Sequence, residues 1–369
     1  MTEQRPLSSG RARDEAGPTR LRDRALAVIA FGVVVVLLHQ AAFVLSALVV
    51  AAILFSLTAD AISAIARLRF GRLAVPNWLA SVAALTLISV ALFTLTSLIL
   101  AQLNDVLTLA FTYAARAPEA TADLFAWAGP EIASAVREAM RSVDLTRDLR
   151  TLAAQAGDLM QGTVLVILFV AFLFAERARF ETKLTRLLGS EERAEQARAL
   201  LGSITHQVNR YLVVKTVVSA LTGTLVFAAC WAWGLALAGA VGVITFLFNY
   251  LPNIGSIVAT LLVGLIAHVQ FENAATTLAL LALVSGIQFV CGNILDPVLT
   301  GRALRLSTFG ILLSLAFWGL IWGVAGMFLC VPIMVALMLT AGRVPALRPL
   351  AVLLSRDGSL PEPEAARRR

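Results

Sequence analysis

Charge is scarce in this sequence. Charged residues make up 14% of its 369 residues, hydrophobic residues make up 59%, and the mean hydropathy is +0.84. Because soluble domains carry roughly 25% charged residues, this composition excludes a soluble globular protein and indicates a polytopic helical membrane protein. The scarcity is greatest from Thr216 to Gly301, where there is no lysine or arginine and only Glu272 and Asp296 carry charge.

Histidine and cysteine, the residues that most often build catalytic and metal sites, are also few. The chain has three of each, widely separated and without metal-ligand spacing: His39, His206, His268, Cys230, Cys291 and Cys330. The sequence also lacks the HExxH, GxSxG and GxxxxGK motifs of zinc peptidases, serine hydrolases and P-loop nucleotide sites. We therefore expect no metal, no cofactor and no enzymatic activity, and no transport driven by ATP bound to this chain.

The net charge of +7 does not indicate a nucleic-acid partner, because the basic residues lie in tails and loops. Cytoplasmic loops of membrane proteins are enriched in Lys and Arg. Applied to this chain, that rule predicts a cytoplasmic-membrane protein with both termini in the cytoplasm and residues 102–158 outside it. Lys215, at the end of a predicted span, is expected to extend its ammonium to the membrane surface.

Hydropathy divides the chain into alternating polar and membrane segments of an all-α, polytopic transmembrane helical bundle. We predict a disordered cytoplasmic tail (1–24), membrane helices (25–101), a small extracytoplasmic helical domain (102–158), a span (159–175), a cytoplasmic amphipathic segment (176–211), a membrane core (212–341) and a cytoplasmic tail (342–369).

Three pairs of apolar runs are too short for ordinary spans. Each run has fewer than the ~20 residues that cross a bilayer as a helix. The pairs are 25–38 with 41–57, 235–251 with 254–268, and 307–322 with 324–339. We expect each pair to form a helical hairpin, and the sequence leaves open whether the hairpins span the membrane or re-enter it.

The middle pair contains the most informative stretch, Thr245 to Ile257, with the sequence TFLFNYLPNIGSI. Proline removes a backbone donor and disfavours helix at the residue before it. Such a break at membrane depth survives only against protein or water, and transporters place binding sites at broken helices. The alternative is a tight turn at the membrane surface. The candidate transport residues in this stretch are Asn249, Pro252, Asn253, Gly255 and Ser256.

The following apolar span carries a second polar group, which we expect to face the first. Gln288 and Asn293 are predicted near one helix face, followed by Asp296 and Pro297. An ionised Asp near mid-bilayer costs about 2.5–3.5 kcal/mol on insertion scales, so it requires a functional reason there. Alternatively, Asp296 makes a surface turn or caps the next helix, and Glu272 is a solvated loop residue.

Small residues recur near the C-terminal end of the membrane core. Gly319 and Gly323 form a GxxxG pattern, and Gly326 follows. This pattern lets helices approach closely. We expect the three glycines to pack against another helix, within the protomer or across a subunit boundary.

Four motifs in this order resemble those of the autoinducer-2 exporter family of bacterial membrane proteins. They are QVNRYLVVK (Gln207–Lys215), FNYLPNIGS (Phe248–Ser256), QFVCGNILDPVLTG (Gln288–Gly301) and GVAGMFLCVP (Gly323–Pro332), within a resemblance covering about residues 20–345. The family more often has Glu-Asn where this chain has Gly292-Asn293. A coupling role of that acidic residue is therefore not carried over to position 292.

The resemblance implies a transporter that exports a signalling molecule or exchanges cations for protons. It also implies a homo-oligomer, with a pentamer as one candidate assembly, in contact with the lipid bilayer. We therefore predict a secondary transporter or exporter of a small solute, such as an autoinducer-2-like molecule, that does not hydrolyse ATP. The alternatives are a sodium (lithium)/proton antiporter that uses Asp296 and a non-transporting scaffold that binds an envelope partner through residues 102–158.

Overall fold

The structure, a computed structural model, describes residues 16–67, 77–114, 129–142, 145–252, 254–271, 273–300, 307–344, 347–355 and 358. The described part of the chain is helical and contains no strand, which confirms the all-α prediction. The elements are α1 (Ala16–Gln40), α2 (Ala42–Arg67), α3 (Asn77–Ala114), α5 (Pro130–Ser142), α6 (Leu145–Leu188), α7 (Glu191–Ala232), α8 (Ala238–Phe248), α9 (Ile254–Phe271), α10 (Ala274–Phe289), the π-helix η2 (Val290–Leu295), α11 (Asp296–Thr300), α12 (Thr308–Ala341) and α13 (Arg348–Leu354).

The helices have the length and surface of a membrane bundle. Within the described residues, seven helices are long and apolar enough to cross a membrane, and Ala25–Gln40 and Ala238–Phe248 are shorter apolar helices. Large apolar side chains such as Phe172, Leu261 and Phe309 are more than 60% exposed on the isolated chain. Such a surface suits contact with lipid chains, and the chain is a multi-pass membrane protein.

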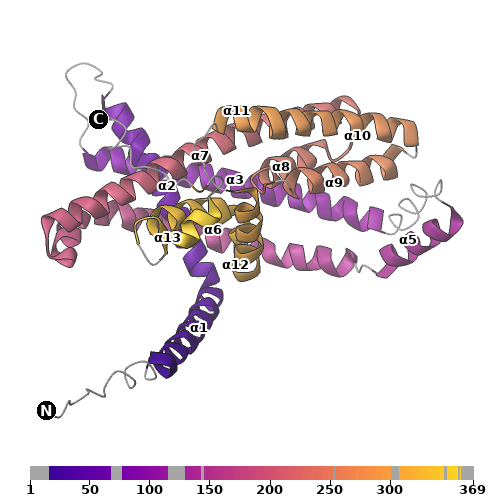
Figure 1. The fold of residues 1–369 in the computed structure, drawn as a ribbon. Coiled ribbons are helices and arrows are strands. Elements are labelled where there is room, and N and C mark those ends of the chain that lie inside the picture. The colour runs from indigo at the N-terminus through magenta and orange to yellow at the C-terminus, as the bar shows by residue number, and fades with distance from the viewer. Residues whose placement is uncertain are drawn as a thin grey trace, which may run out of the picture.

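The bundle is elongated, and its polar connections gather at its two ends. Figure 1 shows the turn between α6 and α7 at one end, and α5 with the turn between α9 and α10 at the other. The long helix α7 runs through the middle and contacts α2, α6, α8, α10, α11 and α12. Helix α7 therefore borders both the α8–α9 hairpin and the α10–α11 segment.

Two long helices replace several of the separate segments that hydropathy suggested. Helix α6 has 44 residues and crosses the boundaries at 158/159 and 175/176, and α7 has 42 residues and crosses the boundary at 211/212. The segment 176–211 is therefore the end of α6, a turn and the start of α7. The turn uses Gly189 with φ +69° and Ser190, which caps α7 by accepting a hydrogen bond from the Arg193 amide.

The first apolar pair, α1 and α2, forms an open V rather than the expected tight hairpin. Only Ala41 separates the helices, and helical hydrogen bonds continue across the junction from the Ala41 amide to Leu37 and from the Leu45 amide to Ala41. Figure 1 shows the two helices diverging from this bend. Because the junction has no Gly or Pro to reverse the chain, α1 and α2 pack on α12 instead of along each other.

The second pair, α8 and α9, is a hairpin with one short arm. Helix α8 has 11 residues, which is about 16 Å of helix and half of the ~30 Å hydrocarbon core. The hairpin begins and ends toward the α9–α10 end of the bundle (Figure 1). Close approach of α7 to α8 is allowed by glycine, because a Cβ on Gly223 would lie 2.8 Å from the Gly242 carbonyl oxygen.

The third pair is a hairpin formed inside α12. Gly323 has φ +60° and ψ −139°, which breaks the helix between residues 308–322 and 324–341. The base of this hairpin contacts the start of α7, because Arg343 donates a hydrogen bond to the Gln196 carbonyl. The predicted topology assigns both of these residues to cytoplasmic segments. The α8–α9 and α12 hairpins therefore enter the bundle from opposite ends.

A candidate transport site at the tip of the α8–α9 hairpin

The tip of the α8–α9 hairpin is a compact turn at residues 249–252. The Tyr250 amide donates to the Leu247 carbonyl at 3.1 Å and the Leu251 amide to the Phe248 carbonyl at 2.8 Å. Gly255 then passes so close to the tip that a Cβ would lie 1.7 Å from the Phe248 carbonyl oxygen. Only a residue without a Cβ fits there. Asn253, another candidate of this stretch, lies outside the described residues.

Two side chains of the tip bind one face of α7. The Asn249 amide nitrogen donates to the Ser219 hydroxyl at 3.0 Å, and both residues are buried. The Tyr250 hydroxyl lies 2.7 Å from the Thr216 hydroxyl. Because Thr216 donates its own proton to the Leu212 carbonyl, Tyr250 is the donor in this pair. The tip is therefore fixed to α7 by side-chain hydrogen bonds.

Lys215 and Asp296 form an ion pair beside this contact, with 2.7 Å between Nζ and Oδ2. Only 9% of the Lys215 side chain and 22% of the Asp296 side chain are exposed. The expectation that Lys215 reaches the membrane surface is wrong, because its ammonium is held inside by the carboxylate. The sequence did contain a signal: Lys215 is the last cation before the Lys/Arg-free stretch, and Asp296 is one of the two acids within it.

A local π-helix, η2, separates Gln288 from Asp296. π-helical turns inside longer helices often occur at functional sites, because they shift the register of the residues that follow. Here Gln288 is buried while Asn293, inside η2, and Pro297 are exposed, so the structure does not place Gln288 and Asn293 on one face. Asp296 begins α11 and turns toward α7.

Thr245 on α8, one helical turn before the tip residue Asn249, and Gln288 on α10 carry buried polar atoms without a partner in the described part of the chain, and we call these two residues the polar layer. Thr245 is 1% exposed and Gln288 is 6% exposed, and among the described residues neither the Thr245 hydroxyl nor either amide atom of Gln288 has a hydrogen-bond partner. Each lies one helical turn from a residue of the apolar cluster between α7, α8, α9 and α10, namely Val241 and Val284. These groups can bind a polar solute, because a buried polar group without a partner costs about 1–3 kcal/mol.

Two further unpartnered atoms, His268 Nδ1 and Thr277 Oγ1, lie on α9 and α10 toward the turn that joins them. The apolar cluster contains Val263, Leu280 and Val284, which are fully buried between these atoms and Gln288 along the helices. An apolar layer therefore separates this polar pair from Gln288 along the helices.

The remaining candidates have assigned places. Ser256 is half-buried on the first turn of α9. A Cβ on Gly326 would lie 1.9 Å from the Trp318 carbonyl oxygen, and one on Gly319 would lie 3.0 Å from the Met327 Cε atom, so both glycines serve packing within the α12 hairpin itself. A Cβ on Gly323 would meet no atom within 4 Å, and this glycine forms the turn.

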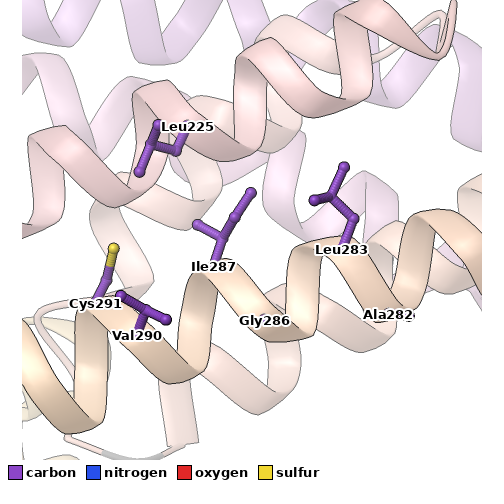
Figure 2. Close-up of a pocket in the computed structure, with 7 residues that line it drawn as sticks. All are labelled: Leu225, Ala282, Leu283, Gly286, Ile287, Val290 and Cys291. Atoms are coloured by element: carbon purple, nitrogen blue, oxygen red, sulfur yellow. The ribbon is translucent and has the colours of Figure 1, made fainter.

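A hollow on the outside of the bundle lies apart from these polar groups. It is lined by apolar side chains of α7, α10 and η2, including Leu225, Ile287 and Val290, as Figure 2 shows. Because it offers no polar side chain, it does not belong to the polar site. Within the described ranges no three His, Cys, Asp or Glu residues gather, so this part of the chain offers no metal centre.

Comparison with known proteins places these features in a family. The sequence model of the AI-2E family transporters matches residues 26–344. The chain is 34% identical over 208 residues to the AI-2 transport protein TqsA of Escherichia coli K12, which covers 56% of this chain and 59% of that protein. It is 33% identical over 192 residues to a putative transport protein of Borreliella burgdorferi, covering 52% and 53%. The chain thus spans between half and two thirds of the length of these curated relatives.

Proposed function

We propose that this chain, which belongs to the AI-2E family of transporters, is a secondary transporter whose solute passes the tip of the α8–α9 hairpin. The observation that carries this proposal is the buried arrangement of that tip. The hairpin with the short arm α8 brings Asn249 and Tyr250 against α7, beside the Lys215–Asp296 pair, and among the described residues Thr245 and Gln288 are buried without a partner on α8 and α10. A static scaffold gains nothing from an interrupted helix whose polar groups are kept in a dry interior.

The solute route follows from the depth of these groups. Thr245 and Gln288 supply hydrogen bonds to a polar solute, and Asn249 and Ser219 can exchange their mutual bond for bonds to it. The apolar cluster around Val241 and Val284 closes the route toward the α9–α10 end. Movement of the hairpin tip relative to α7 would open it, as expected for alternating access around a site at a broken helix.

The finer assignments follow the family and the relatives. The relative TqsA is named for transport of AI-2, which supports export of an autoinducer-2-like molecule as the specific activity of this chain. We further propose a homo-oligomer in the bacterial cytoplasmic membrane, with both termini in the cytoplasm and residues 102–158 outside. The 24 Lys and Arg residues in the segments assigned to the cytoplasm support this orientation.

Everted membrane vesicles test the proposed activity. Vesicles from cells that express the chain should accumulate autoinducer-2 from the medium, as measured by a reporter strain after lysis. Asn249→Ala should lower the rate about tenfold, because the tip loses a side-chain hydrogen bond in a dry site. Thr86→Val on α3 is the control, since the Thr86 hydroxyl binds only its own helix at an exposed position. Equal accumulation by vesicles without the protein would refute the proposed export.

A second function is favoured by one observation, the partly buried carboxylate of Asp296 in an ion pair with Lys215. An intramembrane acid paired with a lysine can exchange a cation for protons. The same vesicles, energised to a pH gradient, should then lose that gradient when sodium or lithium is added, and Asp296→Asn should abolish the response. A response to either ion without autoinducer-2 accumulation would replace export by antiport.

A further inference from the structure

The ion pair and the hairpin tip contact adjacent turns of α7. Lys215 binds Asp296 at 2.7 Å, its neighbour Thr216 accepts from Tyr250 at 2.7 Å, and Ser219, one turn later, accepts from Asn249 at 3.0 Å. The tip also contacts the α12 hairpin, because the rings of Tyr250 and Phe328 lie 6.0 Å apart. A change at the ion pair therefore acts on the segment that holds the tip.

We propose that Lys215 is a positioning residue whose ammonium neutralises the Asp296 carboxylate and so holds the hairpin tip in place. A proton that binds Asp296 replaces Lys215 and releases the tip. This inference rests on the proposed function. In the step, a proton from water forms an O–H bond on the Asp296 carboxylate, which becomes neutral, and Lys215 keeps its charge without a partner. The reverse step returns the proton to water and restores the pair.

The burial of the two side chains makes this exchange a switch. A buried ion pair is tolerated, but removal of one partner leaves an uncompensated charge that is strongly destabilising. Once Asp296 is neutral, the Lys215 ammonium, 9% exposed, must move to gain water. Because Lys215 and Thr216 are adjacent on α7, that movement disturbs the Tyr250 bond. Asp296, 22% exposed, is the member of the pair that water reaches more easily.

The other titratable side chains identified around the pair come from α7, the hairpin tip and α12. Besides Lys215 they are Tyr211 of α7, which interacts electrostatically with Asp296, Tyr250 of the tip, and Cys330 of α12 near Tyr211. The unperturbed pKa values of tyrosine and cysteine lie above about pH 8. Among these described side chains, the Asp296 carboxylate is thus the acceptor that the proposed proton would neutralise.

The reactivity of a cysteine at the tip tests the switch without a known solute. Leu251 is buried at the tip, so Leu251→Cys is introduced with Cys230, Cys291 and Cys330 replaced by alanine, and its reaction with N-ethylmaleimide is followed in proteoliposomes. Asp296→Asn and Lys215→Met should each accelerate the reaction about tenfold. The double variant should be no faster than either single variant, because all three remove the same interaction.

The pH dependence of this reaction and the effect of Lys215→Arg distinguish a positioning role of Lys215 from a merely structural one. Lowering the pH should accelerate the reaction of the Leu251→Cys protein but leave it unchanged when Asp296→Asn is added. Lys215→Arg should restore the slow rate, because arginine keeps the charge. Ser134→Cys on α5, exposed and remote from the pair, should react equally in all backgrounds and report intact folding.

The outcomes discriminate clearly. An unchanged rate at position 251 in both single variants, or a pH response that persists with Asp296→Asn, overturns the proposal. If Asp296→Asn does not fold, the absence of acceleration at low pH in the parent protein overturns it as well. If lithium or sodium accelerates the reaction of the cysteine at position 251 at constant pH, a metal cation rather than a proton replaces Lys215 at Asp296. That result would contradict the proposed role of the proton. A working switch without solute flux would leave this inference standing and remove the proposed function.

Discussion

At the scale of single residues, the site depends on which side chains are missing as much as on those present. Gly255 permits the return arm of the hairpin to touch the Phe248 carbonyl, and no other residue fits that contact. The sequence predicted this residue, because Pro252 and Gly255 mark a broken helix. It did not predict that Lys215 pairs with Asp296, since 81 positions separate them and only the tertiary fold brings α11 against α7.

Gly255→Ala should destabilise the protein by about 1–3 kcal/mol, the usual cost of overpacking a filled interior. A Cβ at 1.7 Å from the Phe248 carbonyl oxygen requires the backbone to move. Gly286→Ala on α10 is the matched control, because a Cβ there meets no atom within 4 Å. Thermal unfolding in detergent measures both. Equal melting temperatures for the two variants would contradict the close approach at the tip.

Thr245→Val and Gln288→Leu should reduce transport while leaving stability unchanged or higher. Each removes polar atoms that are buried without a partner, so the folded protein loses no hydrogen bond. A solute that binds these atoms loses its contacts, and the rate of accumulation in vesicles should fall about tenfold. Normal transport by both variants would show that this layer lies outside the route, whereas a lowered melting temperature would show that the atoms already have partners.

At the scale of elements, hydropathy located the helices but not their continuity. The runs around Pro252 and Gly323 were predicted as hairpins, and the structure shows a half-length α8 and a break inside α12. The V of α1 and α2 was not predicted, because Ala41 carries no turn signal. The π-helix η2 was missed for the same reason, since VCGNIL has no composition that distinguishes it from an α-helical turn. The α1–α2 bend and η2 both depend on tertiary contacts with neighbouring helices.

Gly323→Leu should lower the stability of the α12 hairpin by about 1–3 kcal/mol, the cost of holding a side-chain-bearing residue in a disfavoured backbone conformation. The cause is φ +60° rather than crowding, because a Cβ at Gly323 meets no atom. Gly319→Ala should cost less, since its new Cβ meets the flexible end of Met327. Melting in detergent compares the two. A larger loss for Gly319→Ala would mean that close packing, not the turn, governs this hairpin.

At the scale of the whole molecule, the two ends of the bundle should face different compartments. Helix α5 and the α6–α7 turn lie at opposite ends of the bundle (Figure 1). Ser134 is exposed on α5, and Leu187 is exposed at the end of α6. In a cysteine-free background, an impermeant maleimide applied to intact cells should label Ser134→Cys but not Leu187→Cys. Labelling of Leu187→Cys alone would invert the orientation derived from the basic residues.

Water access to the polar layer tests the central claim most directly, because it requires no knowledge of the solute. Single cysteines replace Thr245 and Gln288 in the layer, and Val241 and Val284, one helical turn away in the apolar cluster, serve as matched controls. If solute passes the hairpin tip, a small water-soluble methanethiosulfonate should modify the first pair about tenfold faster than the second. Equal modification of both pairs, or none at Thr245→Cys and Gln288→Cys, would contradict a transport route at the tip.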